Sequence, residues 1–196
     1  MKIGIDIDEV VAGFIEKFLN YSNKKNKTSF TLQDVTNYNL RKTRVHKHKS
    51  REEDLLEISE FQNSEDFNLI ELIEGAKNGL EKLSRDYEIY FITSRPEEIK
   101  EKTKDFFYNN FPENGYKFIF SGDVYGGKTK SQICNELEIS LMVEDNPFYA
   151  LDCAKKGIKT FLLDKPWNKN YEKHENIIKV NNWKEILEKL NVEREE

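Results

Sequence analysis

The chain has few of the residues that mark several large classes of protein. Its 196 residues include only 2 Cys, 4 Pro and 9 Gly, which excludes a disulfide framework, a collagen-like repeat and a linker-like chain. No apolar run approaches the roughly 20 residues that a membrane-spanning helix needs, so no membrane partner is expected. The N-terminal stretch MKIGIDIDEVV carries carboxylates inside its apolar run and does not fit a signal peptide. A reducing cytoplasm is the expected location.

The residues that are present suit a folded domain. Hydrophobic residues make up only 37%, but 13 Phe, 9 Tyr and 2 Trp supply large side chains for a core. The 31 basic and 36 acidic residues give a net charge of −5, which argues against a dedicated nucleic-acid-binding protein. These features together predict a soluble α/β or α+β domain.

Short β-branched or aromatic runs alternate with helical segments along most of the chain. Strands are predicted at Lys2–Asp8, Tyr87–Thr93, Lys117–Ser121, Ser140–Glu144 and Lys159–Leu163. Helices are predicted at Glu97–Asn110, Ser131–Glu138, Pro147–Lys156 and Trp183–Leu190. This alternation predicts a parallel sheet with right-handed crossovers.

The interval Gly13–Asp86 breaks this alternation, because it has helical patterns and is far longer than one crossover. It indicates a helical insertion after the first strand. The insertion contains a basic run, which is either a solvated face or a lid that presents positive charge to an anionic ligand. The run comprises Arg41, Lys42, Arg44, Lys47, Lys49 and Arg51.

Acidic pairs follow two of the predicted strands. Asp6 and Asp8 end the first strand, and Glu144 and Asp145 end the fourth. Since ligands bind at the carboxyl ends of parallel strands, these side chains are candidates for one site. Carboxylates so near to one another repel unless a cation lies between them or one of them is protonated. Mg²⁺ is a suitable cation because it prefers oxygen ligands. No His or Cys cluster has zinc spacing, and no GxxxxGK[ST], GxSxG or GxGxxG motif occurs.

Hydroxyl and basic residues accompany two further elements and suggest an anion site. Thr93 and Ser94 end the second strand where a helix begins, so they either bind an anion or cap the helix. Arg95 follows them and either contacts a substrate or faces solvent. Lys128 and Lys130 precede another helix, where an ammonium group can reach a phosphate; each is otherwise an ordinary surface lysine.

The order of these motifs resembles the haloacid dehalogenase-like (HAD) superfamily of phosphotransferases. The matching stretches are IGIDIDEVVAG, YFITSRP, KTKSQICNEL and LMVEDNP. The resemblance implies a three-layer α/β/α fold around a parallel sheet, with a core of residues 1–13 and 87–196 and a helical cap of residues 14–86. Dehalogenases of the superfamily lack the second Asp of the first motif, so Asp8 favours a phosphatase.

Within the superfamily, the chain is similar to the 5′(3′)-deoxyribonucleotidase family. Asp6–Phe14 (DIDEVVAGF) follows its first motif, and Leu162–Asn168 (LLDKPWN) resembles its closing segment. Two features depart from the animal enzymes: the second acidic pair is Glu-Asp instead of Asp-Asp, and the cap shows no clear match. The resemblance implies a Mg²⁺-dependent cytoplasmic hydrolase of nucleoside monophosphates. The base, the sugar, the 5′ or 3′ position and the presence of a homodimer remain open.

The resemblance also implies roles for the acidic residues. Asp6 would be the nucleophile that forms an aspartyl-phosphate, and Asp8 the general acid and base. Mg²⁺ would be held by the Asp6 carboxylate, the Asp8 backbone carbonyl and Asp145, with Glu144 as a direct or indirect helper.

The remaining candidates would bind the substrate. Thr93, the Ser94 N–H and Lys130 would hold the phosphate oxygens, with Lys128 as the alternative lysine, while Arg95 would contact the substrate. Phe14 would either stack on a nucleobase or belong to the apolar stripe of its own helix with Phe18 and Leu19, packing the cap against the core. Two other functions remain open: hydrolysis of a different phosphomonoester, such as a sugar phosphate or a nucleic-acid end, and non-catalytic phosphate binding.

Overall fold

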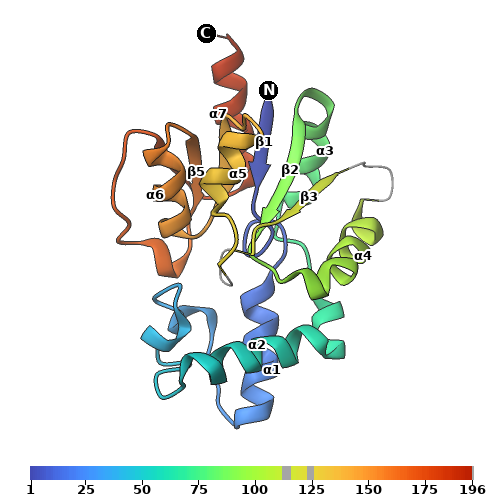
Figure 1. The fold of residues 1–196 in the computed structure, drawn as a ribbon, viewed down its shortest axis with the longest axis vertical. Helices are drawn as coiled ribbons and strands as arrows, with labels where there is room; N and C mark the ends of the chain where they lie inside the picture. Colours follow the sequence, from blue (N-terminus) through green and yellow to red (C-terminus); the bar gives the residue numbers. More distant parts are fainter. Residues whose placement is uncertain (112–115, 123–125, 196) are drawn as a thin grey trace.

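A computed structural model describes residues 1–111, 116–122 and 126–195, and its centre is a parallel sheet (Figure 1). The six strands follow the order β3-β2-β1-β4-β5-β6. Because the order reverses beside β1, the carboxyl ends of β1 and β4 form the edge where ligands bind in such sheets. The strands are β1 (Lys2–Ile5), β2 (Glu88–Thr93), β3 (Lys117–Phe120), β4 (Leu141–Glu144), β5 (Lys159–Leu163) and β6 (Ile177–Val180).

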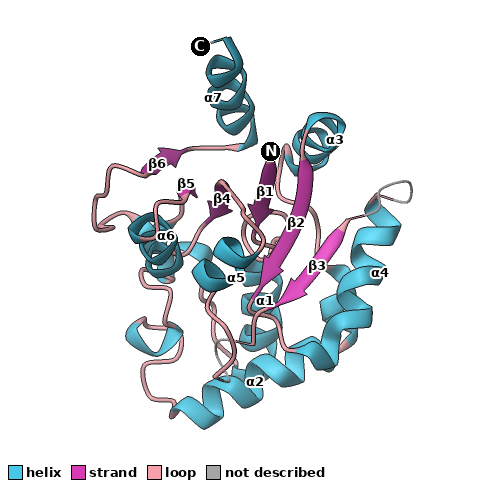
Figure 2. Ribbon diagram, turned by 45° about the horizontal axis from the view of Figure 1, so that its top comes forward, coloured by secondary structure: helices cyan, strands magenta, loops and turns pink. Residues whose placement is uncertain are grey.

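Helices cover both faces of the sheet (Figure 2), which confirms the predicted three-layer α/β/α fold. Strand β2 shows why: Tyr90 and Ile92 enter one apolar cluster, whereas Ile89 and Phe91 enter another on the opposite face. The first face carries α5 (Lys130–Glu136) and α6 (Pro147–Lys155). The second carries α3 (Ala76–Asp86), α4 (Lys100–Asn110) and α7 (Trp183–Glu195).

A second group of helices lies beyond the carboxyl ends of the central strands (Figure 1). Two backbone hydrogen bonds join the segment that enters this group to the segment that leaves it. The Gly13 N–H donates to the Glu71 carbonyl at 2.9 Å, and the Ile73 N–H donates to the Val11 carbonyl at 2.8 Å. The group contains α1 (Phe14–Asn26), η1 (Leu32–Asp34), η2 (Leu40–Lys42), α2 (Arg51–Asn63) and η3 (Glu65–Leu69).

The last helix of the predicted insertion packs on the sheet. Helix α3 contacts β2 and α7, and a Cβ atom on Gly79 would lie 2.3 Å from the Trp183 ring. Glycine therefore permits the close approach of the two helices, and the Trp183 Nε1–H donates to the Val10 carbonyl at 2.8 Å. Within the described ranges, no helix is long and apolar enough to cross a bilayer.

Three local features differ from the sequence predictions. Strand β1 ends at Ile5 instead of Asp8, and Asp6–Asp8 lead into a turn at Glu9, whose φ of 61° is left-handed. Strand β6 (Ile177–Val180) was not among the predicted strands. The predicted helix Glu97–Asn110 begins as a separate turn, η4 (Glu97–Ile99).

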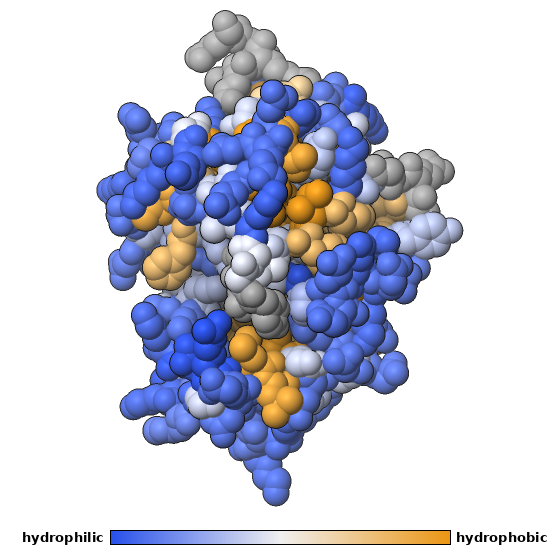
Figure 3. Space-filling view, in the orientation of Figure 1, coloured by the Kyte–Doolittle hydropathy of each residue, from blue (hydrophilic) through white to orange (hydrophobic). Residues whose placement is uncertain are grey.

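The surface in Figure 3 is largely hydrophilic, with smaller apolar areas on both the sheet domain and the helical group below it.

Candidate active site

Three buried carboxylates and a buried lysine meet at the carboxyl ends of β1 and β4. Asp6, Glu144 and Asp145 each offer an oxygen within 4.8 Å of the others. The Lys130 Nζ lies 2.6 Å from Asp6 Oδ1 and 2.5 Å from Glu144 Oε1. All four residues are at most 6% exposed, so their charges act on one another in a poorly solvated environment.

The start of α5 decides which candidate lysine reaches these acids. Thr129 caps the helix by accepting a hydrogen bond from the Gln132 N–H, which turns Lys130 inward as the first helical residue. Lys128 instead pairs with Glu136 at 2.7 Å, and its side chain is 61% exposed. The structure thus brings Lys130, and not Lys128, to the acids.

The two members of the second acidic pair have different surroundings. Glu144 Oε2 accepts hydrogen bonds from the backbone N–H groups of Asp145 and Asn146, both at 2.8 Å, while its other oxygen faces Lys130. Asp145 Oδ2 accepts from the Trp167 Nε1–H at 2.8 Å. Trp167 and Asn168, whose amide donates to the Asp145 carbonyl at 2.8 Å, support this loop.

Sequence reasoning missed Trp167 and Asn168 as site residues. Both belong to the LLDKPWN segment, which carried only a family resemblance, although its position directly after β5 was a usable signal.

The residues after β2 lie beside the first acidic pair. Thr93 is 1% exposed, and its Oγ1 accepts a hydrogen bond from the Arg95 N–H at 3.1 Å. Ser94 Oγ donates to the Tyr149 hydroxyl at 3.2 Å. Arg95 is 3% exposed and its guanidinium is bonded to the Asp8 carboxylate. The structure therefore brings Thr93 and Ser94 to the same edge, and places Arg95 against another predicted site residue.

Negative charge exceeds positive charge at this edge. Five carboxylates face three cations, which leaves a formal excess of two negative charges. Burial, and then repulsion by Glu144 and Asp8 against the attraction of Lys130, raises the pKa of Asp6 to about 8. Burial also raises the pKa of Asp145 well above its usual range. The carboxylates are Asp6, Asp8, Glu9, Glu144 and Asp145, and the cations are Lys130, Arg95 and Lys165.

This excess charge and the donor atoms fit a divalent metal ion. With all five carboxylates ionised, one divalent cation would neutralise the excess, and the three grouped side-chain donors of Asp6, Glu144 and Asp145 are carboxylate oxygens, as hard cations prefer.

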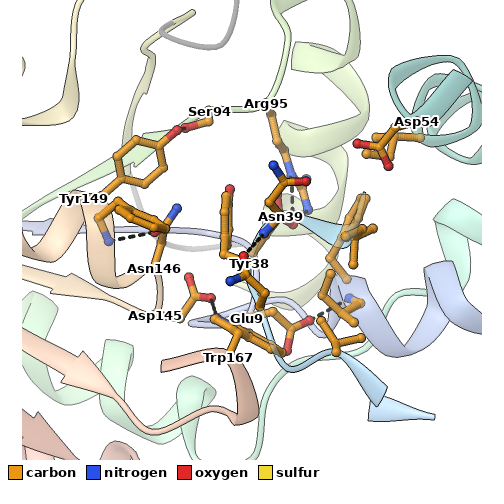
Figure 4. A pocket seen from close by; sticks show the side chains of 18 of the residues that line it. Glu9, Tyr38, Asn39, Asp54, Ser94, Arg95, Asp145, Asn146, Tyr149 and Trp167 are labelled. Carbon is orange, nitrogen blue, oxygen red and sulfur yellow. Dashed lines mark hydrogen bonds and ion pairs between the residues drawn. The ribbon is translucent and has the colours of Figure 1, made fainter. Parts of the chain in front are cut away.

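A cavity of about 470 Å³ opens above the acids, between the sheet and the helical group (Figure 4). Tyr38 reaches into it from the loop between η1 and η2, with its ring 6.2 Å from that of Tyr149. Burial of the Tyr38 hydroxyl, followed by the nearby Tyr149 and Asp145, raises its pKa well above the usual range. The sequence analysis did not single out Tyr38 or Tyr149.

The basic run does not act as one surface. Arg41, Lys42 and Arg51 line the cavity, whereas Arg44 pairs with Asp34 at 3.6 Å and its side chain is 81% exposed. Members of the run therefore lie both at the cavity and on the solvent-exposed surface of the cap.

Phe14 lies in an aromatic cluster of the helical group. Its ring stacks on Phe18 at 6.0 Å and meets Phe61 edge-on at 5.2 Å. The residue is 8% exposed, although it also lines the cavity. Most of its surface is thus covered by neighbouring rings.

A comparison with models of protein families matches residues 1–195 to the 5′ nucleotidase, deoxy (pyrimidine), cytosolic type C proteins. The chain belongs to this family. A nucleotidase of Clostridium acetobutylicum is 29% identical over 189 residues, covering 95% of this chain and 91% of the relative. A 5′(3′)-deoxyribonucleotidase of Bacillus subtilis is 27% identical over 196 residues, covering 96% and 97%.

Solved structures share the fold. A haloacid dehalogenase-like hydrolase from Streptococcus pneumoniae has a TM-score of 0.68 at 14% identity, covering 96% of this chain and 97% of the other. A HAD hydrolase from Bacillus subtilis, bound to magnesium, has a TM-score of 0.64 at 15% identity, covering 97% and 98%. The family and fold predictions are confirmed, and this nucleotidase-family chain is a phosphomonoester hydrolase.

Proposed function

We propose that this hydrolase is a Mg²⁺-dependent nucleotidase that removes phosphate from a (deoxy)nucleoside monophosphate through an aspartyl-phosphate on Asp6. The observation that carries the proposal is the buried Asp6–Lys130–Glu144–Asp145 cluster beneath the cavity. About 470 Å³ lies in the range of small-molecule sites, and the deoxyribonucleotidase relative favours a nucleotide. We assign the cap to residues 14–70 and α3 to the core, because the chain returns to the sheet at Glu71–Ile73.

The chemistry divides between the two aspartates of the first motif. A carboxylate oxygen of Asp6 attacks phosphorus, and the bond from phosphorus to the ester oxygen breaks as Asp8 gives that oxygen a proton. Water then attacks the phosphorus of the aspartyl-phosphate while Asp8 takes up the water proton, and the bond from phosphorus to the Asp6 oxygen breaks. Inorganic phosphate leaves, and both aspartates return to their starting states.

The neighbouring polar groups would hold the phosphate oxygens. The Lys130 ammonium lies 2.6 Å from Asp6, so it reaches both the nucleophile and any phosphoryl group bound to it. Thr93 and Ser94 end the adjacent strand and add a hydroxyl and a backbone N–H. Such donors, fixed in a poorly solvated site, stabilise the charge of the transition state.

A divalent metal would be held by the Asp6 carboxylate, the Asp8 backbone carbonyl and Asp145. Glu144 would support it indirectly, because both of its oxygens already accept hydrogen bonds. When bound, the ion neutralises charge on the phosphoryl group and on the carboxylates.

Phosphate release from a panel of substrates tests the proposed function. With Mg²⁺ present, we expect a higher kcat/KM for nucleoside 5′- or 3′-monophosphates than for sugar phosphates. Beryllium fluoride, which mimics the phosphoryl group on an aspartate, should inhibit the reaction. A preference for sugar phosphates or for 3′-phosphorylated oligonucleotides would contradict the nucleotide assignment. A protein without activity on any of these substrates would instead support non-catalytic phosphate binding.

Metal binding should become tighter as the pH rises towards 8. The pKa of Asp6 is about 8 without metal, so at pH 7 the metal must displace a proton from this carboxyl. Affinity for Mg²⁺ should rise by up to about tenfold per pH unit below pH 8 for each proton displaced. Calorimetry at pH 7 in buffers of different ionisation heat should record release of about one proton or more. Metal affinity independent of pH would contradict this coupling. Activity restored after EDTA treatment by Zn²⁺ alone, with Mg²⁺ inert, would contradict the oxygen ligand set.

Phe14→Ala should act mainly through the stability of the cap. Removing a ring packed among Phe18 and Phe61 should lower the free energy of unfolding by about 3–5 kcal/mol. Tyr38→Ala is the matched comparison, because Tyr38 is 42% exposed and should lose less stability but more activity toward nucleotides. Thermal denaturation measures the loss of stability in each variant, and kcat/KM on nucleotide and aryl phosphates measures the loss of nucleotide recognition. If Phe14→Ala selectively impaired nucleotide turnover at unchanged stability, the ring would contact the base.

A further inference from the structure

Arg95 makes a bidentate ion pair with Asp8 at the edge of the cavity. Its Nη2 lies 2.6 Å from Asp8 Oδ1, and its Nε lies 3.2 Å from Oδ1 and 3.1 Å from Oδ2. The Arg95 side chain is 2% exposed, whereas that of Asp8 is 30% exposed. Among the described residues, Arg95 provides every hydrogen bond to the Asp8 carboxylate.

The guanidinium is also fixed on its other sides. Its Nη1 donates to Thr103 Oγ1 at 3.0 Å, and that hydroxyl donates to the Ile99 carbonyl at 2.9 Å. The Arg95 Cζ lies over the Phe67 ring of the cap, 5.2 Å from its centroid. All three guanidinium nitrogens therefore have partners within the protein, and the Arg95 backbone N–H is held by Thr93.

We propose that Arg95 is a positioning residue that orients the Asp8 carboxylate toward the ester oxygen of the substrate. The inference rests on the proposed function, in which Asp8 transfers the proton. A partly exposed aspartate would otherwise sample several rotamers, and a paired, planar guanidinium selects one of them. Holding a proton donor in reactive geometry lowers the barrier by reducing the orientational entropy that must be lost.

The pairing also distinguishes the two oxygens of Asp8. Oδ1 accepts from both Nη2, at 2.6 Å, and Nε, at 3.2 Å, whereas Oδ2 accepts only from Nε, at 3.1 Å. Oδ2 is consequently the oxygen with a lone pair available to carry the proton. It gives this proton to the ester oxygen as the bond to phosphorus breaks, and it takes one from water in the second step.

The dependence on the leaving group tests this role. A nucleoside leaves as an alkoxide that needs a proton, whereas p-nitrophenolate leaves without one, and kcat/KM reports the steps up to phosphoryl transfer. Arg95→Met should lower kcat/KM by about 10²-fold on a nucleoside monophosphate, but by only a few-fold on p-nitrophenyl phosphate. Arg95→Lys keeps the positive charge but lacks the planar guanidinium that bonds both carboxylate oxygens. It should recover part of the loss of kcat/KM on the nucleotide.

A double-mutant cycle separates positioning from direct binding. Once Asp8→Asn has removed the proton donor, adding Arg95→Met should cost almost nothing further on the nucleotide. Multiplicative losses, or equal losses on both substrates caused by a higher KM, would instead assign Arg95 to substrate binding and overturn the proposal.

Two controls keep the result interpretable. Arg44→Met removes an exposed cap arginine outside the cavity and should leave both substrates unaffected. If Arg95→Met fails to fold, Arg95→Lys and its combination with Asp8→Asn carry the same comparison.

A wild-type protein inactive on both substrates would refute the proposed function. An active wild type with a fully active, folded Arg95→Met variant would refute only the role of Arg95.

Discussion

Asp6→Asn should lower kcat/KM on a nucleoside monophosphate by at least about 10⁴-fold and leave the fold intact. The amide is a poor nucleophile and a weak metal ligand, so both the covalent step and metal binding lose their central group. The fold should persist because burial raises the pKa of Asp6 to about 8, so its surroundings accommodate the neutral, protonated form. Asparagine matches that neutral form in size and charge.

Phosphate release and thermal denaturation without metal measure the two halves of this prediction. Asp105→Asn provides the control, because Asp105 is an exposed aspartate on α4 and should change neither quantity. Turnover by purified Asp6→Asn at a rate near that of the wild type would eliminate the aspartyl-phosphate mechanism. A large loss of stability would instead show that the Asp6 charge is needed for folding.

The sequence was sufficient to predict the sheet and the acidic edge for one physical reason. Apolar runs that end in polar residues form buried strands, and the carboxyl ends of parallel strands meet at one edge. Asp6, Thr93 and Glu144 could therefore be placed together without coordinates. The boundary of the cap was harder to predict from the sequence, because helical periodicity is the same whether α3 packs on the sheet or on other helices. The Gly79–Trp183 contact, which joins positions more than a hundred residues apart, supports our proposal that α3 belongs to the core.

Partners of charged side chains were the least predictable feature. Arg95 pairs with Asp8 across 87 positions, and Lys130 pairs with Asp6 across 124. No local pattern encodes such pairs. His46 illustrates the same limit: it lies in the basic run, yet its ring is buried, with Nδ1 2.5 Å from Asp54 Oδ1 and Nε2 3.0 Å from Glu57 Oε2.

Lys130→Met should destabilise the metal-free protein by about 3–5 kcal/mol, which corresponds to a fall in Tm of about 6–20 °C for a chain of this size. The Lys130 ammonium is the cation between Asp6 and Glu144, and its side chain is 2% exposed. Methionine fills similar space but leaves the buried carboxylates without their counter-charge. Activity should also fall sharply, since the group proposed to hold the phosphate is lost.

Lys128→Met is the matched control, two positions earlier in the loop that leads into α5. Because Lys128 forms an exposed pair with Glu136, its loss should change stability by no more than about 0.5 kcal/mol. Adding Mg²⁺ should raise the Tm of Lys130→Met more than that of the wild type, since the ion replaces part of the missing positive charge. If both lysine variants were equally stable without metal, protonation of the acids, and not Lys130, would be what keeps the cluster folded.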